Sequence, residues 1–462
     1  MTMKKFSKDK EIYRKIGVIS LPIIVQNIID AAVNSVDVLM LNSVGQSAIS
    51  ATSLATYYSN FCFMILYGIG TGVSMLGAQY WGKGDKTTVE KVSALGLRIS
   101  ISVAVVFTAI MLLFPTVAMK VFTSDAELIE LGATYLRFVA PAIIFWCIST
   151  VYLSVLRCIG KTSLATLMEI LALVLNVSLN AVFIFGLLGM PKMGIAGVAI
   201  ATSIARFLQF VGCLLISVLN KNVVGMGFRF VFAKMGIIVK DFISMAIPAI
   251  MNDLSWSLAF SMYGVILGHL GTDAVAANSI TNVIRNLGTV LCYGLAGGSG
   301  IVVGQILGTG NIEEGIKAGK IMFRLSVYAG LLGGAVVLLL KPVAISVADV
   351  TEGAKDILNF MLWINSYYIL GTAVNTTLIA GIFRAGGDSK FGLICDTVDM
   401  WAYAVPLGLI AAFVLKLPIK WVYFLLCTDE FVKWPWVLKH YFSNKWAKDI
   451  TRDEISKALP HE

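Results

Sequence analysis

Two stretches of the sequence nearly repeat one another: YGIGTGVSMLGAQYWGKG at residues 67–84 and YGLAGGSGIVVGQILGTG at residues 293–310. They lie 226 residues apart, and the same register holds well outside them. The matching pairs include Pro22 and Pro248, Gly45 and Gly271, Arg98 and Arg324, and, after one inserted residue, Arg157 and Arg384. The repeat predicts two related halves, residues 1–220 and 237–462, joined by a cytoplasmic linker at 221–236.

The composition places both halves in a membrane. Of the 462 residues, 58% are hydrophobic and 14% are charged, whereas soluble domains carry about 25% charged residues. The apolar residues fall into runs of about 20, which cross a hydrocarbon core of about 30 Å as helix. The runs are too continuously apolar for an outer-membrane barrel.

We therefore predict an all-α integral membrane protein with twelve transmembrane helices in two pseudo-symmetric six-helix lobes. The expected spans are residues 16–41, 47–79, 93–114, 131–156, 163–188, 194–219, 237–268, 274–306, 319–340, 357–383, 391–415 and 418–438.

Basic residues indicate the orientation, because cytoplasmic loops carry an excess of Lys and Arg. Those preceding the first span are Lys4, Lys5, Lys8, Lys10, Arg14 and Lys15. The connections that share this side are basic as well. We expect a multi-pass protein of the cell inner membrane with both termini cytoplasmic, and a parallel repeat with its axis along the membrane normal. This rule accounts for the net charge of +9, so we expect membrane lipid and no nucleic acid as partner.

Polar side chains inside the spans are the best functional leads, because a charge within a bilayer costs several kcal/mol. In the first span, Asn27, Asp30, Asn34 and Asp37 fall within an arc of about 80° at 100° per residue. They form one polar stripe on an otherwise apolar helix. Pro22, near the inner end of this span, leaves one backbone carbonyl without its usual donor and marks a natural kink.

A second polar group lies in the fifth and sixth spans. Asn176 and Asn180 share one face of the fifth span with Glu169, and Thr202 and Ser203 lie in the sixth. If these spans pack against the first, a carboxylate, two carboxamides and a hydroxyl converge. Such a group suits Na⁺ or a protonatable Asp; the alternative is a polar packing network without an ion.

The second half does not repeat this chemistry. The offsets that relate the two halves place Tyr263, Tyr403 and Leu407 opposite Asp37, Asn176 and Asn180. A packing role alone would more naturally persist in both halves. The asymmetry therefore favours an ion site in the first half, with no cofactor besides the coupling ion.

Several acids in the later spans receive no role from the sequence alone. They are Asp253, Asp396, Asp399, Asp429 and Glu430. Lys433 lies four residues after Asp429 and is placed to pair with it. Glu169 and Asp396 are related by the offset of 227 and lie beside Arg157 and Arg384. We expect structural ion pairs there, and a carboxylate partner for Arg285.

The sequence contains no complete enzyme motif of the kinds considered below. Residues 77–83 spell GxxxxGK, but Gly84 follows where a phosphate loop needs Ser or Thr, and a membrane span precedes it instead of a core strand. The sequence contains no HExxH or GxSxG motif. We expect no enzyme, and energy drawn from an ion gradient or from the gradient of the substrate.

The order of motifs along the whole chain resembles the multidrug and toxic compound extrusion (MATE) family. The motifs are Pro22, Asp37, Gly68 to Gly72, Gln79-x-x-Gly82-x-Gly84, Arg157-x-x-Gly160, Asn176-x-x-x-Asn180, Phe185-Gly186, Gly194-x-x-Gly197 and Ala201-Thr202. Each motif alone is weak, and the ordered set is specific.

The resemblance implies two six-helix lobes arranged as a V, and antiport of Na⁺ or H⁺ against organic, often cationic, compounds. It implies a first-lobe cation site at Asp37, Asn176, Asn180 and Thr202, the residues that the polar stripes single out. One branch of the family also uses a Glu in helix seven and an Asp in helix ten. Here those positions are Trp256 and Ala373, so the resemblance does not extend to second-lobe coupling.

Candidates for a substrate cavity are polar or aromatic, and aromatic faces suit organic cations. They are Tyr57, Phe61, Met64, Trp256, Tyr263 and Asn282. Pro22 and Pro248 are candidate hinges, and we expect a monomer. The alternatives are a lipid-linked oligosaccharide or other lipid flippase of the same superfamily, a membrane-embedded enzyme, and a channel or scaffold.

Overall fold

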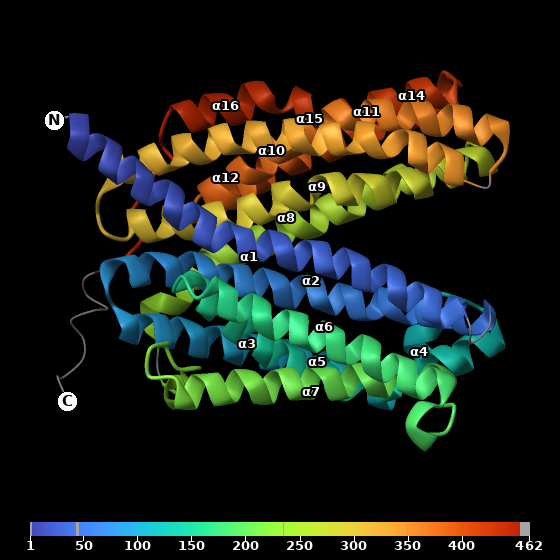
Figure 1. Ribbon diagram of the computed structural model, residues 1–462, viewed down its shortest axis with the longest axis horizontal. Helices are drawn as coiled ribbons and strands as arrows, with labels where there is room; N and C mark the ends of the chain where they lie inside the picture. The colour runs from blue at the N-terminus through green and yellow to red at the C-terminus, as the bar shows by residue number, and fades with distance from the viewer. Residues whose placement is uncertain (1, 43–45, 234, 349, 453–462) are drawn as a thin grey trace. The chain divides into compact units, whose positions relative to one another are not determined.

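The computed structural model describes residues 2–42, 46–233, 235–348 and 350–452, with the side chains of 2–9, 34, 35, 37–39, 41, 42, 46 and 49 left outside the description. Figure 1 shows an arrangement of long helices. The helices are α1 (Thr2–Asn42), α2 (Gln46–Lys83), α3 (Lys86–Leu113), α4 (Pro115–Lys120), α5 (Ala126–Cys158), α6 (Thr162–Phe185), η1 (Leu187–Gly189), α7 (Gly194–Leu219), η2 (Phe228–Phe230), α8 (Gly236–Gly268), α9 (Thr272–Leu307), α10 (Ile312–Val347), α11 (Glu352–Thr376), η3 (Thr377–Phe383), α12 (Ser389–Val398), η4 (Asp399–Ala404), α13 (Val405–Leu409), η5 (Ile410–Val414), α14 (Ile419–Leu426), α15 (Asp429–Val432) and α16 (Trp434–Phe442).

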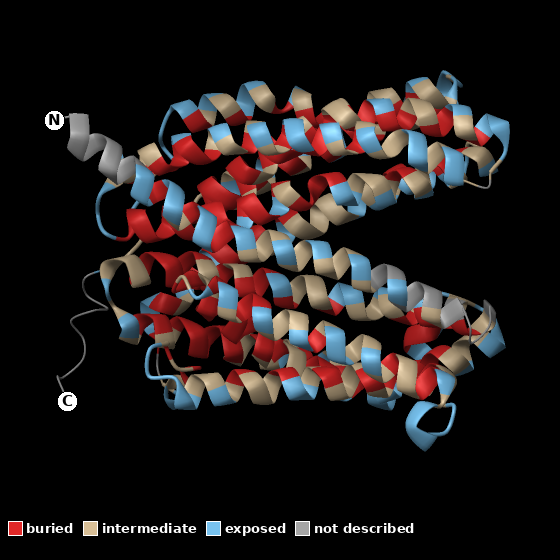
Figure 2. Cartoon of the chain, viewed as in Figure 1, coloured by how far each residue is buried: buried red, intermediate tan, exposed pale blue. Residues whose placement is uncertain are grey.

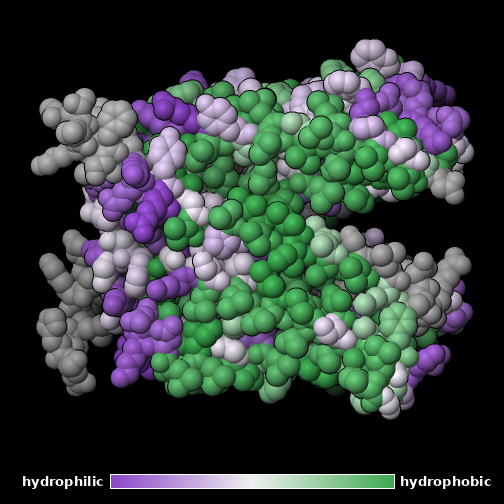
Figure 3. Space-filling model, in the orientation of Figure 1, coloured by the Kyte–Doolittle hydropathy of each residue, from purple (hydrophilic) through white to green (hydrophobic). Residues whose placement is uncertain are grey.

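The helices follow the predicted spans. Among the described residues, ten helical stretches are long and apolar enough to cross a membrane. The seventh predicted span is α8, which is 33 residues long. The twelfth, predicted at 418–438, is divided into α14, α15 and α16. The short helix α4 was not predicted. Within each unit described below, apolar side chains cover the middle of the helices and hydrophilic ones gather toward the ends (Figure 3).

The repeated glycines end repeated helices. Gly84 follows α2 and Gly310 follows α9, with φ of 84° and 80°, values that glycine adopts without steric cost. The next residue caps the following helix in both halves. The Asp85 carboxylate accepts a hydrogen bond from the Thr88 N–H at 2.9 Å, and the Asn311 side chain accepts one from the Glu314 N–H at 3.1 Å. The repeat of 226 residues therefore corresponds to the same helix–turn–helix connection in both halves.

The described chain forms two compact units. The second unit comprises residues 2–27, Gly82–Gly84 and Ser244–Thr451, and the first comprises Ile28–Trp81, Asp85–Ile243 and Arg452. The division follows the repeat with a few exceptions: the first part of α1 and Gly82–Gly84 group with the second half of the sequence, and the start of α8 and Arg452 group with the first. Figure 2 shows buried residues where helices of one unit face each other, and exposed residues along the outer faces.

Glycines on one face of α9 position α1 in the second unit. A Cβ atom on Gly294 would clash with Ile24, and one on Gly298 would clash with Ser20. Spacing of four residues places both glycines on the same helix face, which allows close helix approach. Ile16 and Ile19 of α1 belong to the same buried cluster as residues of α9, α10, α11 and α16.

In the first unit, α5 lies against α3, α4, α6 and α7. Its packing on α2 again depends on small residues. A Cβ atom on Gly70 would lie 2.7 Å from the Ser154 Oγ, and one on Gly77 would lie 2.7 Å from the Cys158 Sγ. The contact between α6 and α7 carries the predicted polar group.

Candidate functional site

The amides and hydroxyl predicted to meet in the first half do so at the contact between α6 and α7. The Asn176 Nδ2 donates a hydrogen bond to the Thr202 Oγ1 at 3.1 Å. The Asn180 Nδ2, one helical turn further, lies 3.4 Å from the Asn176 Oδ1. The Thr202 hydroxyl donates to the Val198 carbonyl of its own helix at 3.0 Å. Asn180 is buried, so these groups form a linked polar set away from the surface.

Asp37 lies on α1, within the same unit as α6 and α7. Its side chain, like that of Asn34, falls outside the described residues, so its place in the site stays a prediction. Pro22 lies inside α1 and Pro248 inside α8, and their action as hinges also stays a prediction.

Two other polar residues of these spans point elsewhere. The Ser203 hydroxyl donates to the Phe138 carbonyl of α5 at 2.7 Å. Glu169 forms an ion pair with Arg206 at 3.4 Å, and the Arg206 guanidinium lies 4.8 Å from the centre of the Trp146 ring. Neither Ser203 nor Glu169 contacts the Asn176–Thr202 pair through these bonds.

The ion pair of the first half recurs in the second. The offset of 227 relates Glu169 to Asp396 and Arg206 to Lys433, and Lys433 pairs with Asp396 at 3.1 Å. Glu169 and Asp396 form ion pairs as predicted, but their partners, Arg206 and Lys433, were not predicted for them. Arg384 instead pairs with Asp253 at 2.6 Å.

The second half contains a buried group of charges, which we call the carboxylate cluster. Its members are Asp396, Asp399, Asp429, Glu430 and Lys433, each at most 6% exposed. The Lys433 Nζ lies 3.1 Å from Asp396 and from Glu430, and 3.8 Å from Asp399. The predicted pairing of Lys433 with Asp429 is wrong, because the Lys433 ammonium group forms its ion pairs with these three carboxylates instead.

Asp429 has tyrosine partners instead. The Tyr263 and Tyr368 hydroxyls donate to its Oδ2 atom at 3.2 and 3.4 Å. Glu430 accepts from the Asn375 Nδ2 at 2.6 Å and from the Thr372 hydroxyl at 3.4 Å. The cluster could not be assembled from the sequence, because its members come from α12, η4 and residues 429–433, and their hydrogen-bond partners come from α8 and α11. The sequence feature that could have indicated the cluster is the presence of acidic residues in two consecutive predicted spans.

A family model described as MatE matches residues 22–182 and 248–410, one copy in each half. The chain belongs to the MatE family.

Similar proteins match over most of the chain. The chain is 23% identical to the uncharacterized transporter YisQ of Bacillus subtilis (strain 168), covering 92% of this chain and 93% of that protein. It is 24% identical to the multidrug resistance protein MdtK of Photorhabdus laumondii, covering 88% and 89%. A MOP superfamily transporter from Pyrococcus furiosus has the same fold, with a TM-score of 0.84 at 21% identity over 93% and 96% of the two chains.

The cavity candidates of this MATE transporter lie on α2, α8 and α9. Tyr57 and Phe61 of α2 are exposed, and Met64, Trp256 and Asn282 are half-buried. Tyr263 is buried, and its hydroxyl is engaged by Asp429. The assignment of these residues to a substrate cavity stays a prediction.

Arg285 of α9 departs from expectation. Its guanidinium lies 4.7 Å from the centre of the Phe260 ring, and within the described part of the chain we find no carboxylate at ion-pair distance. Phe260 in turn packs between Trp256 and Tyr263, with ring centres 4.3 and 5.2 Å apart. The expected carboxylate partner is therefore replaced by an aromatic face.

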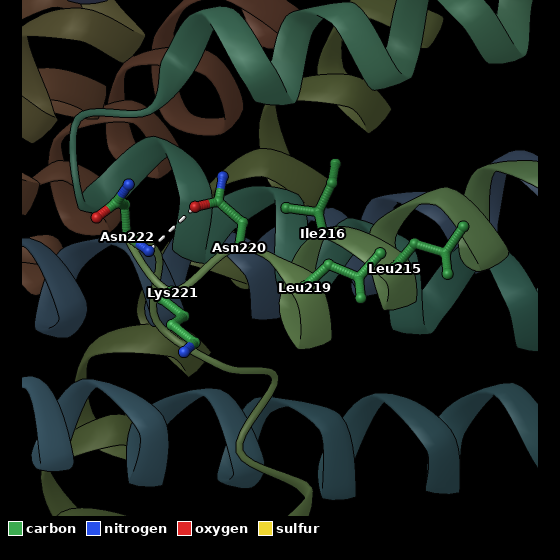
Figure 4. A pocket seen from close by; sticks show the side chains of 6 residues that line it. All are labelled: Leu215, Ile216, Leu219, Asn220, Lys221 and Asn222. Carbon is green, nitrogen blue, oxygen red and sulfur yellow. Dashed lines mark hydrogen bonds between the residues drawn. The ribbon is translucent and has the colours of Figure 1, made fainter.

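A shallow groove of about 550 Å³ lies at the end of α7 (Figure 4). Its lining residues are Leu215, Ile216, Leu219, Asn220, Lys221 and Asn222. The Asn222 N–H donates to the Asn220 Oδ1 at 3.0 Å, which closes the turn after the helix. None of the predicted site residues lines this groove.

Proposed function

We propose that this MATE transporter exports small organic, often cationic, compounds in exchange for Na⁺ or H⁺. The coupling ion binds in the first half at Asp37, Asn176, Asn180 and Thr202. The observation that carries the proposal is the Asn176–Thr202 hydrogen bond with Asn180 beside it. The polar set lies at a contact between two membrane-spanning helices. An apolar contact there would avoid the free-energy cost of placing polar groups within the membrane.

The chemistry of this set suits either ion. Carboxylate, carboxamide and hydroxyl oxygens are ligands for hard cations, and a carboxyl group among neutral polar neighbours is also suited to carry a proton. The Asn176 amide and Thr202 hydroxyl already restrain one another. An ion that binds Asp37 therefore meets oxygens that are held in place before it arrives.

Coupling acts through α1 in this scheme. Ion binding at Asp37 from outside bends α1 near Pro22 and favours release of the organic compound outward. Release of the ion inside resets the cycle. The ion shifts the conformational equilibrium only by its difference in affinity for the two states, so the oxygens must hold it better in one state than in the other.

The neighbouring hydroxyls of α7 provide a matched test. Thr202→Val removes the hydroxyl that accepts from Asn176, and Ser203→Ala removes one that bonds the Phe138 carbonyl instead. We expect export of ethidium from proteoliposomes under an imposed ion gradient to fall by roughly tenfold in Thr202→Val, within the usual range of coupling effects. Ser203→Ala should transport normally. Equal effects of the two substitutions would argue against the site.

The basic loops support an orientation with both termini in the cytoplasm, and the two halves support a monomer that needs no second copy to complete the repeat.

Absence of export of any organic cation, with scrambling of labelled lipid, would instead support a lipid flippase of the same superfamily.

A further inference from the structure

The carboxylate cluster of the second half contains more negative charge than it can hold buried. Four carboxyl groups face one ammonium group, and all five residues are at most 6% exposed. With every group ionised, three negative charges would stay uncompensated. An isolated buried charge is so costly that a group takes up or loses a proton instead. Arg384, which is linked to Asp396 through Asn252, is already paired with Asp253.

Asp399 is the member with the poorest partners. Neither of its carboxyl oxygens receives a hydrogen bond, although the residue is only 4% exposed. Its Oδ2 atom points at the Lys433 Nζ, which lies 3.8 Å away and is closer to Asp396 and Glu430. The buried Oδ1 of Asn375, whose Nδ2 bonds Glu430, also lacks a partner.

The backbone near the cluster is irregular as well. Asp399 is the first residue of η4, a π-helical segment, and Asn375 lies two residues before the π-helical η3. π-Helical turns cost regular hydrogen bonding and are frequent at functional sites. The irregular backbone thus coincides with the unpartnered side chains in both helices.

The repeat relates this cluster to the first-half site. The two offsets place Tyr263 opposite Asp37 and Asp429 opposite Thr202. The hydrogen bond from the Tyr263 hydroxyl to Asp429 at 3.2 Å therefore occupies, in the second half, the positions of the proposed ion site. The acidic residue is Asp37, on the first helix, in the first half, and Asp429, on the last span, in the second half.

We propose that Asp399 carries an exchangeable proton in this cluster, and that the second half of the transporter thereby binds H⁺ at a site separate from Asp37. The role in coupling rests on the proposed antiport; the proton itself does not. The step is an acid dissociation: the O–H bond of the Asp399 carboxyl breaks, and the proton passes to water or to a neighbouring carboxylate. A metal cation is disfavoured, because the Lys433 ammonium already occupies the centre among the carboxylates.

Other titratable groups near Asp399 come from several elements. They are Tyr263 of α8, Cys395 and Asp396 of α12, and Asp429, Glu430 and Lys433 of the last span. Tyr368 of α11 and Cys427 lie near Asp429 and Glu430 instead. Tyrosine and cysteine side chains ordinarily ionise above neutral pH. The exchangeable charge thus belongs to the carboxyl groups and Lys433.

A hydrogen-bonded path leads from the cluster to a more open residue. The Asn252 Nδ2 donates to Asp396 at 2.8 Å, and the Asn252 Oδ1 accepts from Arg384 at 2.9 Å. Arg384 contacts Asp253, whose side chain is 27% exposed. Arg384 follows the tenth predicted span, in a connection predicted to be cytoplasmic. In an exporter driven by H⁺ that moves inward, we therefore expect this path to release the proton to the cytoplasm.

Infrared spectroscopy of the purified transporter in lipid tests the proton directly. We expect a protonated-carboxyl C=O band at neutral pH that shifts in D₂O, is lost in Asp399→Asn, and returns at a shifted position in Asp399→Glu. Asp356→Asn is the control, because Asp356 is an exposed carboxylate paired with Lys420; this variant should keep the band. An unchanged band in Asp399→Asn would overturn the proposal, and a band that never exchanges in D₂O would show a locked structural proton and overturn it as well.

Ethidium export in proteoliposomes then tests coupling. We expect Asp399→Asn to lower export driven by an H⁺ gradient by roughly tenfold, with Asp356→Asn close to the wild type. H⁺-driven export that survives Asp399→Asn would overturn the coupling role. Because the infrared measurement needs no transport, it distinguishes failure of this inference from failure of the proposed antiport, which would show as export that ignores every ion gradient.

Discussion

Lys433 is the one cation among the buried carboxylates, so its removal should destabilise the second unit strongly. Its Nζ lies 3.1 Å from both Asp396 and Glu430. At an effective dielectric constant of about 20, two unit charges at this distance attract one another by about 5 kcal/mol. Desolvation of the ions offsets part of this attraction. Measured losses on breaking a buried pair are about 3–5 kcal/mol, and we expect Lys433→Met to fall in this range.

Thermal unfolding of the purified protein in detergent is the assay. Lys433→Met should unfold at a clearly lower temperature than the wild type, whereas Lys221→Met, at the exposed end of α7, should differ by about 0.5 kcal/mol or less. The deficit should be larger at alkaline than at acidic pH, since protons can replace the missing ammonium by neutralising the carboxylates. A Lys433→Met variant that unfolds like Lys221→Met at both pH values would refute this account of the cluster.

Two further predictions concern packing and capping. Gly298→Val should weaken the docking of α1 on α9, because even a Cβ atom there would clash with Ser20; we expect reduced thermal stability and faster proteolysis of the N-terminal segment, with Gly297→Ala as a milder control, since its Cβ would meet nothing closer than 3.7 Å. Asn311→Ala should cost about 0.5–2 kcal/mol of stability, because the Asn311 side chain caps α10; an unchanged melting temperature would indicate that the cap contributes nothing to this helix.

Most of the fold follows from the sequence, because a membrane leaves few choices to a chain. Backbone polar groups must be satisfied within a spanning segment, so runs of apolar residues become helices. The repeated glycines fixed the halves because Gly84 and Gly310 terminate equivalent helices. The position of the twelfth span was predicted correctly, but its division into the separate helices α14, α15 and α16 was not.

The candidate site could be predicted only in part, for a reason visible in the residues. Asn176 and Asn180 lie on one helix face, and periodicity places such residues together. The carboxylate cluster joins residues from α12, η4 and the last span, and helical periodicity carries no information on which helices pack together. Lys433 illustrates the difficulty: Asp429 is four residues away in sequence, and Asp396 is the partner in space.

The central claim, ion-coupled export through the first-half site, is tested most directly by efflux of ethidium from proteoliposomes. Wild-type and Asp37→Asn transporters would be compared under an imposed Na⁺ gradient and, separately, an imposed H⁺ gradient. We predict that one of these gradients drives export by the wild type and that Asp37→Asn abolishes it. Full gradient-driven export by Asp37→Asn would contradict the claim and place coupling elsewhere in the chain.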